Sequence, residues 1–175
     1  IYNSGVENKS VSLTDCVFDH NDDRGVYIES NGGITWSGGS ASRNVGDYGA
    51  VLWNASAATS KTFTISNVTY NDNKTSGMEG YSLGKITLTN VSASRNLSGS
   101  GVALDNCRFS SGVCQGSGDV IISGTYGSLE FNDNSYYGLN VASRGAISLS
   151  NVNASGNNIL DGVYLNNDYD NATAG

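Results

Sequence analysis

Apolar and polar residues alternate along most of the chain in short runs that end at a Gly or an Asn. In the stretch "GKITLTNVSASRNLSGSGVALDN", apolar side chains occur at Ile86, Leu88, Val91, Ala93, Val102 and Leu104. A period of two is typical of strands with one buried face, and each run spans only about three to six residues. The pattern therefore predicts short strands joined by turns rather than a helix.

The same pattern occurs six times, in units that begin at Val11, Ile34, Phe63, Ile86, Val120 and Ile147. Each unit reaches an Asn 10 residues after its first apolar residue, or 14 residues after it in the unit at Val120, which carries an insertion of four. A Gly follows each Asn, and we assign this position to Gly25, Gly49, Gly80, Gly101, Gly138 and Gly162. One unit of three short strands cannot bury its own apolar face, whereas stacked units can, so the repeat predicts a solenoid.

The recurring Asn residues indicate how the units stack. They are Asn21, Asn44, Asn73, Asn96, Asn134 and Asn157. Asparagine tolerates the left-handed backbone conformation of sharp turns. Stacked units would place these side chains above one another, within hydrogen-bonding reach. We therefore predict an Asn ladder along one turn of the solenoid.

With "ITLTNVSASRN" followed by "GVALDN", the chain resembles the repeats of right-handed parallel β-helices of the pectate-lyase-like superfamily, from Val11 to about Asn167. The resemblance implies an all-β, right-handed parallel β-helix of about six to seven coils, with three short strands per coil, as one domain over residues 1–175. That superfamily includes lyases, glycosidases, phage tailspikes, adhesins and surface repeats, so the fold assigns no function.

The alternation also assigns the faces of the first strand in each unit. The inward positions form two apolar ranks, led by Val11 and Leu13. The outward positions are hydroxyl-bearing: Ser12, Thr14, Thr35, Ser37, Thr64, Ser66, Thr87, Thr89, Ser148 and Ser150. Only Ile121, which is paired with Ser123, breaks the pattern. Such a face suits a solvated strand surface, lateral packing, O-linked glycans or an ice-binding surface.

Composition narrows the classes of partner. The chain contains 23 Gly and no Pro, and its formal net charge is −7. An acidic chain is a poor ligand for nucleic acid and for anionic membrane surfaces, which attract basic patches. No apolar run approaches the roughly 20 residues of a membrane-spanning helix. We therefore expect neither nucleic acid nor a membrane as partner.

The three cysteines bear on the compartment. Cys107 and Cys114 lie seven residues apart in a polar insertion, and we predict a local disulfide between them rather than two free thiols. A disulfide implies an oxidising setting, so we expect an extracellular or cell-surface location. Cys16 occupies an apolar position and is interpreted as a small buried side chain.

The densest charged segment is "FDHNDDRG", which contains Asp19, Asp22 and Asp23. Because Asp is an ordinary turn residue, we interpret this segment as a solvated turn, with a calcium-supported turn as the alternative. No catalytic residue and no cofactor other than calcium is assigned.

Loops of unequal length at residues 53–61, 105–119 and 124–128 break the repeat, and such loops usually carry recognition. Trp53, Tyr136 and Tyr137 are the exposed aromatic residues we expect to contact a sugar or a partner.

These observations favour a structural role outside the cell. No capping segment is recognisable at either end of the sequence. We therefore expect a stalk, surface array or filament subunit that associates head to tail or continues into neighbouring coils of a longer chain. The alternatives are an adhesin or glycan-binding module with a carbohydrate partner, and a polysaccharide lyase or glycosidase with divergent catalytic residues.

Overall fold

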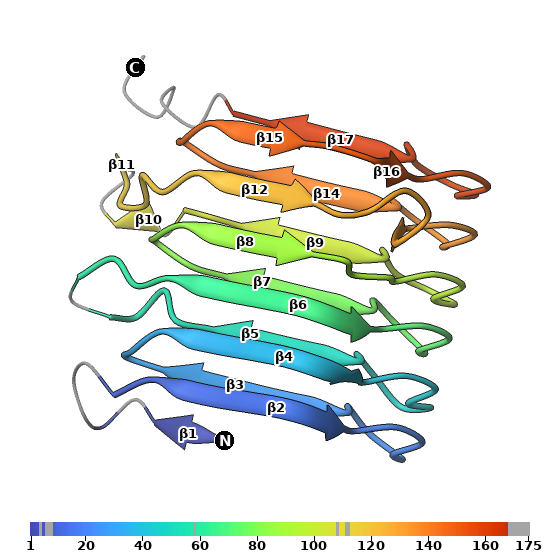
Figure 1. Ribbon diagram of the computed structural model, residues 1–175, viewed down its shortest axis with the longest axis horizontal. Helices are drawn as coiled ribbons and strands as arrows, with labels where there is room; N and C mark the ends of the chain where they lie inside the picture. The colour runs from blue at the N-terminus through green and yellow to red at the C-terminus, as the bar shows by residue number, and fades with distance from the viewer. Residues whose placement is uncertain (4, 6–8, 58, 108, 111–112, 168–175) are drawn as a thin grey trace.

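A computed structural model describes residues 1–3, 5, 9–57, 59–107, 109–110 and 113–167 of the chain. Over these residues the protein is all-β, without a helix, and its parallel strands are wound into a right-handed solenoid of about six turns (Figure 1). We number the coils 1 to 6 by their first strands, which begin at the six apolar residues that open the repeats. The predicted all-β parallel β-helix is confirmed.

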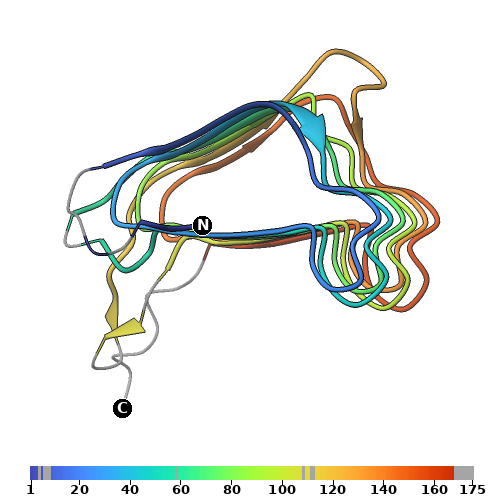
Figure 2. The same ribbon diagram turned by 90° about the horizontal axis from the view of Figure 1, so that it is seen from below.

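Two long sheets face each other across the core, as Figure 2 shows in cross-section. Sheet A consists of β1 (Tyr2–Asn3), β3 (Val26–Ser30), β5 (Ala50–Trp53), β7 (Met78–Tyr81), β9 (Val102–Asp105), β14 (Leu139–Ala142) and β17 (Val163–Asn166). Sheet B consists of β2 (Val11–Val17), β4 (Ile34–Ser40), β6 (Phe63–Thr69), β8 (Ile86–Thr89), β12 (Val120–Ser123) and β15 (Ile147–Leu149). An antiparallel hairpin, β10 (Phe109–Ser110) with β11 (Val113–Cys114), extends from coil 4.

The third strand of each coil is short. In coils 1 to 3 it is the end of the sheet B strand, beyond a bend. In coils 5 and 6 it is the pair β13 (Leu129–Glu130) and β16 (Val152–Asn153), and in coil 4 a single bridging residue, Ser92. In every coil except coil 5, which carries the insertion, the bend falls at the same offset and uses a left-handed residue: Asp15, Gly38, Asn67, Asn90 and Asn151. Asp and Asn adopt this conformation more readily than other side chains.

The inward ranks predicted from the alternation pair in register from coil to coil, as in Val11↔Ile34↔Phe63↔Ile86. They form one continuous apolar core. Trp36 is fully buried within it, with Phe18 and Tyr70 edge-on to the Trp36 ring at 5.5 Å between ring centroids. Cys16 lies partly buried against this core.

The Asn ladder is confirmed along the turn that leads from sheet B to sheet A. From Asn44 onward, the Oδ1 atom of each ladder Asn accepts two hydrogen bonds from the Asn of the preceding coil, one from its backbone N–H and one from its Nδ2. For Asn96, which receives them from Asn73, the distances are 3.0 and 3.2 Å. The four inner residues are fully buried: Asn44, Asn73, Asn96 and Asn134. The ladder thus satisfies buried polar groups while fixing the stacking of the coils.

The glycine that follows each ladder Asn is required by close stacking. At Gly49, a Cβ would lie 2.5 Å from the carbonyl oxygen of Gly77 and 2.7 Å from Nδ2 of Asn73. The assignment of Gly80 to this rank was wrong. The pairing of Ala50 with Met78 puts Gly77 beside Gly49. Gly80 instead faces the core within β7, where a Cβ would lie 2.9 Å from the Phe63 ring.

The structural repeat is two coils long, since odd and even coils differ at the same positions. Before the ladder Asn, odd coils carry an aromatic residue and then Asp or Asn, whereas even coils carry Ala and then Ser. The odd-coil pairs are Phe18-Asp19, Tyr70-Asn71 and Phe131-Asn132, and the even-coil pairs are Ala41-Ser42, Ala93-Ser94 and Ala154-Ser155. Hydrogen bonds join an odd coil to the even coil after it, and an even coil to the odd coil after it. Ser94 N donates to Asn71 Oδ1 at 2.7 Å, and Asn132 N donates to Ser94 Oγ at 3.0 Å.

The opposite edge of the solenoid, where the chain returns from sheet A to sheet B, follows the same two-coil period. Odd coils place Ser at the corner and turn tightly, as at Ser82, whose Oγ accepts the backbone N–H of Gly84 at 3.2 Å. Even coils place Asn there, as at Asn106, whose Nδ2 donates to the carbonyl of Gly84 at 2.7 Å. The longer loops that follow Asn54 and Asn106 therefore emerge two coils apart.

Candidate functional site

The two outer faces of the solenoid have different chemistry. Outward residues of sheet B are hydroxyl-bearing and stand in register, as in Thr35↔Thr64↔Thr87, with Ile121 the next residue of that rank. Aromatic side chains instead gather on the strands of sheet A and on the turns that lead into them: Tyr2, Tyr27, Tyr48, Trp53, Tyr81, Tyr136, Tyr137 and Tyr164. Sheet A is therefore the face with the capacity for specific recognition.

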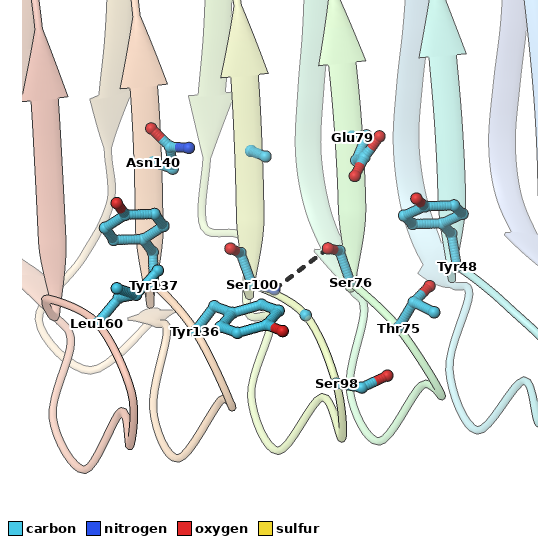
Figure 3. A pocket seen from close by; sticks show the side chains of 12 residues that line it. Tyr48, Thr75, Ser76, Glu79, Ser98, Ser100, Tyr136, Tyr137, Asn140 and Leu160 are labelled. Atoms are coloured by element: carbon cyan, nitrogen blue, oxygen red, sulfur yellow. Dashed lines mark hydrogen bonds between the residues drawn. The ribbon is translucent and has the colours of Figure 1, made fainter.

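A depression crosses sheet A near the ladder turns (Figure 3). We call it the trough. Tyr48 from coil 2 stands at one end, and Tyr136 and Tyr137 from coil 5 stand at the other. Three steps between coils separate these walls, about 14 Å at the usual strand spacing. Its volume is about 370 Å³, which lies in the range of small-molecule sites.

The floor of the trough is low because coils 3 and 4 place small residues there. Ser76 and Ser100 are buried, and Ser76 Oγ accepts the backbone N–H of Ser100 at 3.1 Å. Gly99 and Ala103 complete the floor. At Gly99 a Cβ would meet Ser76 Oγ at 2.5 Å, so this coil cannot carry a larger side chain without moving its neighbour.

One carboxylate, Glu79 on β7, lies in the trough beside Tyr48 (Figure 3). The hydroxyl of Tyr81 donates to Glu79 Oε2 at 2.8 Å, and Tyr48 lies close enough to Glu79 for its phenol to feel the negative charge of the carboxylate. Burial, followed by the neighbouring Glu79 carboxylate, raises the pKa of the Tyr48 and Tyr81 phenols. Both tyrosines therefore remain neutral at physiological pH, and the Tyr81 hydroxyl holds the carboxylate in place.

The trough continues along the strands into a second depression, of about 300 Å³. The two share Glu79, Ala103 and Asn140, and the second adds Tyr81 and Asp105. Burial raises the pKa of the Asp105 carboxyl, although the backbone N–H of Cys107, which donates to Oδ1 at 2.7 Å, acts in the opposite direction. Two carboxylates on adjacent strands thus belong to one continuous surface.

The aromatic side chains on this face are held by contacts with one another. Trp53 stacks on Tyr81 at 4.6 Å between ring centroids, and its Nε1 donates to Ser56 Oγ at 2.9 Å. Tyr137 packs on Tyr164 at 5.4 Å. Rings that are already packed lose little conformational freedom when a ligand binds.

The aromatic residues singled out in the sequence fall in different places. Tyr136 and Tyr137 line the trough, whereas Trp53 lies beyond its lining, against Tyr81. Tyr48, Tyr81, Glu79 and Asp105 were missed. Glu79, Tyr81 and Asp105 lie on strands of sheet A and Tyr48 lies in the turn before β5. Their grouping becomes readable once the register of sheet A is known.

The acidic segment before β3 serves the stacking of coils. Asp19 Oδ1 accepts the backbone N–H of Ser42 at 2.7 Å, and Asp19 Oδ2 accepts the Ser40 hydroxyl at 2.9 Å. Asp22 and Asp23 are exposed. Within the described part of the chain, no three His, Cys, Asp or Glu side chains gather closely enough to hold a metal ion.

The predicted disulfide between Cys107 and Cys114 is confirmed, with 5.2 Å between the Cα atoms. Both cysteines are buried at the base of the β10–β11 hairpin. The bond closes this loop where coil 4 leaves sheet A.

These features define the class of protein: a parallel β-solenoid with an Asn ladder and an aromatic, acidic trough on sheet A. No protein-family model matches the chain, and neither a curated protein nor a solved structure matches it. The described residues contain no helix that is long and apolar enough to span a membrane.

Proposed function

We propose that this chain is an extracellular carbohydrate-binding module that holds an extended sugar chain in the trough. The observation that carries the proposal is the pairing of aromatic walls with a polar floor on a rigid sheet. The apolar face of a sugar ring packs on an aromatic side chain, and its hydroxyls pair with groups such as Asn140, Ser98 and Glu79. The distance between the walls leaves room for more than one ring.

The solenoid supports this role by giving the site a fixed geometry. Trough residues come from coils 2 to 6, and the ladder and the register of sheet A hold these coils together. Side chains on a rigid sheet need little reordering on binding. The disulfide is compatible with an extracellular or cell-surface location. Membership of the pectate-lyase-like superfamily is part of the proposal, and the stacked parallel coils and the Asn ladder support it.

The structural role, as a stalk, surface array or filament subunit with head-to-tail contacts or further coils, stays a prediction. In the present proposal the solenoid is the scaffold that presents the trough. The two ranks of hydroxyl groups on sheet B remain candidates for lateral packing or glycan attachment.

Cleavage of the bound chain is a second candidate, favoured by the two carboxylates Glu79 and Asp105 in one surface depression. Glycoside hydrolysis commonly uses a pair of carboxyl groups, one of which has a raised pKa. If a bound polysaccharide is shortened on incubation and the shortening is lost in Glu79→Gln, the module is an enzyme.

Affinity electrophoresis in gels that contain soluble polysaccharides tests binding. We expect the wild type to be retarded by at least one polysaccharide, and Tyr137→Ala and Tyr48→Ala to lose about tenfold or more in affinity, because each removes an aromatic wall. Thr64→Ala on the outer face of sheet B is the matched control and should migrate like the wild type. Failure of every polysaccharide to retard the wild type, or equal retardation of all variants, would contradict the proposal.

A further inference from the structure

The trough and the depression that continues it carry two carboxylates between them, Glu79 and Asp105. Among the described residues, neither depression is lined by Lys, Arg or His. Glu79 accepts a hydrogen bond from the neutral hydroxyl of Tyr81 at 2.8 Å. Its charge is therefore held in place without being neutralised by a salt bridge.

Arg24, which precedes β3 on this side of the solenoid, is engaged outside the trough. Its Nη2 lies 3.5 Å from Asp47 Oδ2, and its guanidinium lies 5.5 Å from the centroid of the Tyr27 ring. Asp47 also accepts the Thr75 hydroxyl at 3.1 Å, next to the trough rim. Arg24 thus lies between the Asp47 carboxylate and the Tyr27 ring, and its charge is not directed toward a ligand in the trough.

This charge distribution bears on the chemistry of the ligand. Proteins bind carboxylate, sulfate and phosphate groups through Arg and Lys, whose donors match these anions. A ligand carboxylate would instead meet Glu79 and Asp105 in a partly desolvated depression, where repulsion between like charges is stronger than in open water. An amino group or a hydroxyl would meet acceptors of suitable sign.

We infer that the trough selects polysaccharides whose sugars bear free amino groups or hydroxyls only, and rejects those that bear carboxylates. Glu79 is the residue that determines this selectivity. The inference rests on the proposed function, since it names the class of sugar chain that the trough binds. The expected order of affinity is amino sugar, then neutral sugar, then uronic acid.

Isothermal titration calorimetry with three hexasaccharides of similar length tests the inference. The probes are a fully deacetylated β-1,4-glucosamine hexamer, cellohexaose and a galacturonic acid hexamer, each at low and at moderate salt. For the wild type we expect about tenfold weaker binding of the galacturonic acid hexamer than of cellohexaose, and amino-sugar binding that weakens as salt is added. Glu79→Gln keeps an acceptor but removes the charge, so it should narrow the tenfold gap to about twofold and weaken amino-sugar binding. Glu130→Gln, which removes an acid on β13 outside the trough, should leave the order unchanged.

The outcomes separate the two claims. Equal or tighter binding of the galacturonic acid hexamer by the wild type, or an unchanged order in Glu79→Gln, overturns the inference and leaves carbohydrate binding intact. If none of the three probes binds, and none of the polysaccharides in the gels retards the protein, the proposed function fails and the inference fails with it.

Discussion

At the scale of single residues, Tyr70 shows what close stacking demands of a buried side chain. Its ring is fully buried edge-on to Trp36, and its hydroxyl has no hydrogen-bond partner. The flanking coils place Ala41 and Ala93 at the corresponding position, and these small side chains leave room for the ring. The buried Tyr70 ring therefore stabilises the fold, whereas its unpaired hydroxyl destabilises it.

We predict that Tyr70→Phe raises the free energy of unfolding by about 1 kcal/mol, because it removes a buried hydroxyl without a partner. Burial also raises the pKa of the Tyr70 phenol well above its ordinary value. As pH rises through 10, the unfolded chain can ionise this group while the folded chain cannot, so stability falls. Urea unfolding at pH 7 and pH 11 should show that the variant loses less stability than the wild type between the two.

Tyr70→Ala is the control for this substitution, since it removes the ring as well and should cost about 3–5 kcal/mol. Tyr27, Tyr48 and Tyr81 also have raised pKa values, so Tyr70→Phe should still lose part of its stability between pH 7 and pH 11. Lower stability of Tyr70→Phe than of the wild type at pH 7 would mean that its hydroxyl is satisfied in solution.

At the scale of elements, much of a coil could be predicted from the sequence, because the requirements of stacking are the same in every coil. The inward ranks and the ladder Asn recur at fixed offsets, and the register of the strands confirms them. The two-coil period was missed because all units were aligned to one template. Phe18, Ala41 and Tyr70 then looked like variants of one position rather than an alternation.

The assignment of Gly80 to the rank of turn glycines also obscured the two-coil period. With Gly77 in place of Gly80, the glycine follows the ladder Asn by four residues in odd coils and by five in even coils. The trough could not be predicted in this way, since a recognition surface departs from the repeat. Tyr48, Glu79 and Tyr137 occupy outward positions that no rule of stacking constrains, and only the register brings them together.

The ladder makes a prediction about how firmly the coils are joined. The Asn96 side chain accepts two hydrogen bonds from Asn73 through Oδ1 and donates one from Nδ2 to Asn134 Oδ1 at 2.8 Å, all within the protein interior. Asn96→Ala should therefore lower the free energy of unfolding by about 3 kcal/mol or more, because it leaves several buried groups unpaired. Urea unfolding followed by circular dichroism measures the loss.

Asn21→Ala is the matched control at the exposed first rung of the ladder. Its side chain still bonds Asn44, at 2.9 Å, but solvent can replace the partner, so the loss should be about 1 kcal/mol. Equal losses for the two variants would show that burial does not set the strength of the rungs.

At the scale of the whole molecule, the alternation of coils implies that pairs of coils, rather than single coils, are the exchangeable units. In repeat proteins, stability is roughly the sum of repeat stabilities and of the interfaces between neighbours. In the native stack every interface joins an odd coil to an even one. Removal of one coil brings two coils of the same kind together, whereas removal of two preserves the alternation.

We predict that deletion of residues 63–85 destabilises the protein more than deletion of residues 34–85, although the second variant loses more of the chain. The first deletion joins coil 2 to coil 4, which puts Ala41 beside Ala93 and leaves a void where Tyr70 packed. It also brings Arg43 next to Arg95, which loses its ion pair with Asp72 at 2.8 Å. The second deletion joins coil 1 to coil 4, so Phe18 packs on Ala93 and Asp19 can accept the Ser94 N–H, as Asn71 does in the native stack.

Thermal unfolding should give a Tm at least about 5 °C higher for the shorter variant, in which residues 34–85 are deleted, than for the variant that lacks residues 63–85. Deletion of residues 63–119, which joins coil 2 to coil 5 and also keeps the alternation, should behave like the deletion of residues 34–85. If stability instead falls in proportion to the number of residues removed, the number of coils governs the stack and their alternation does not.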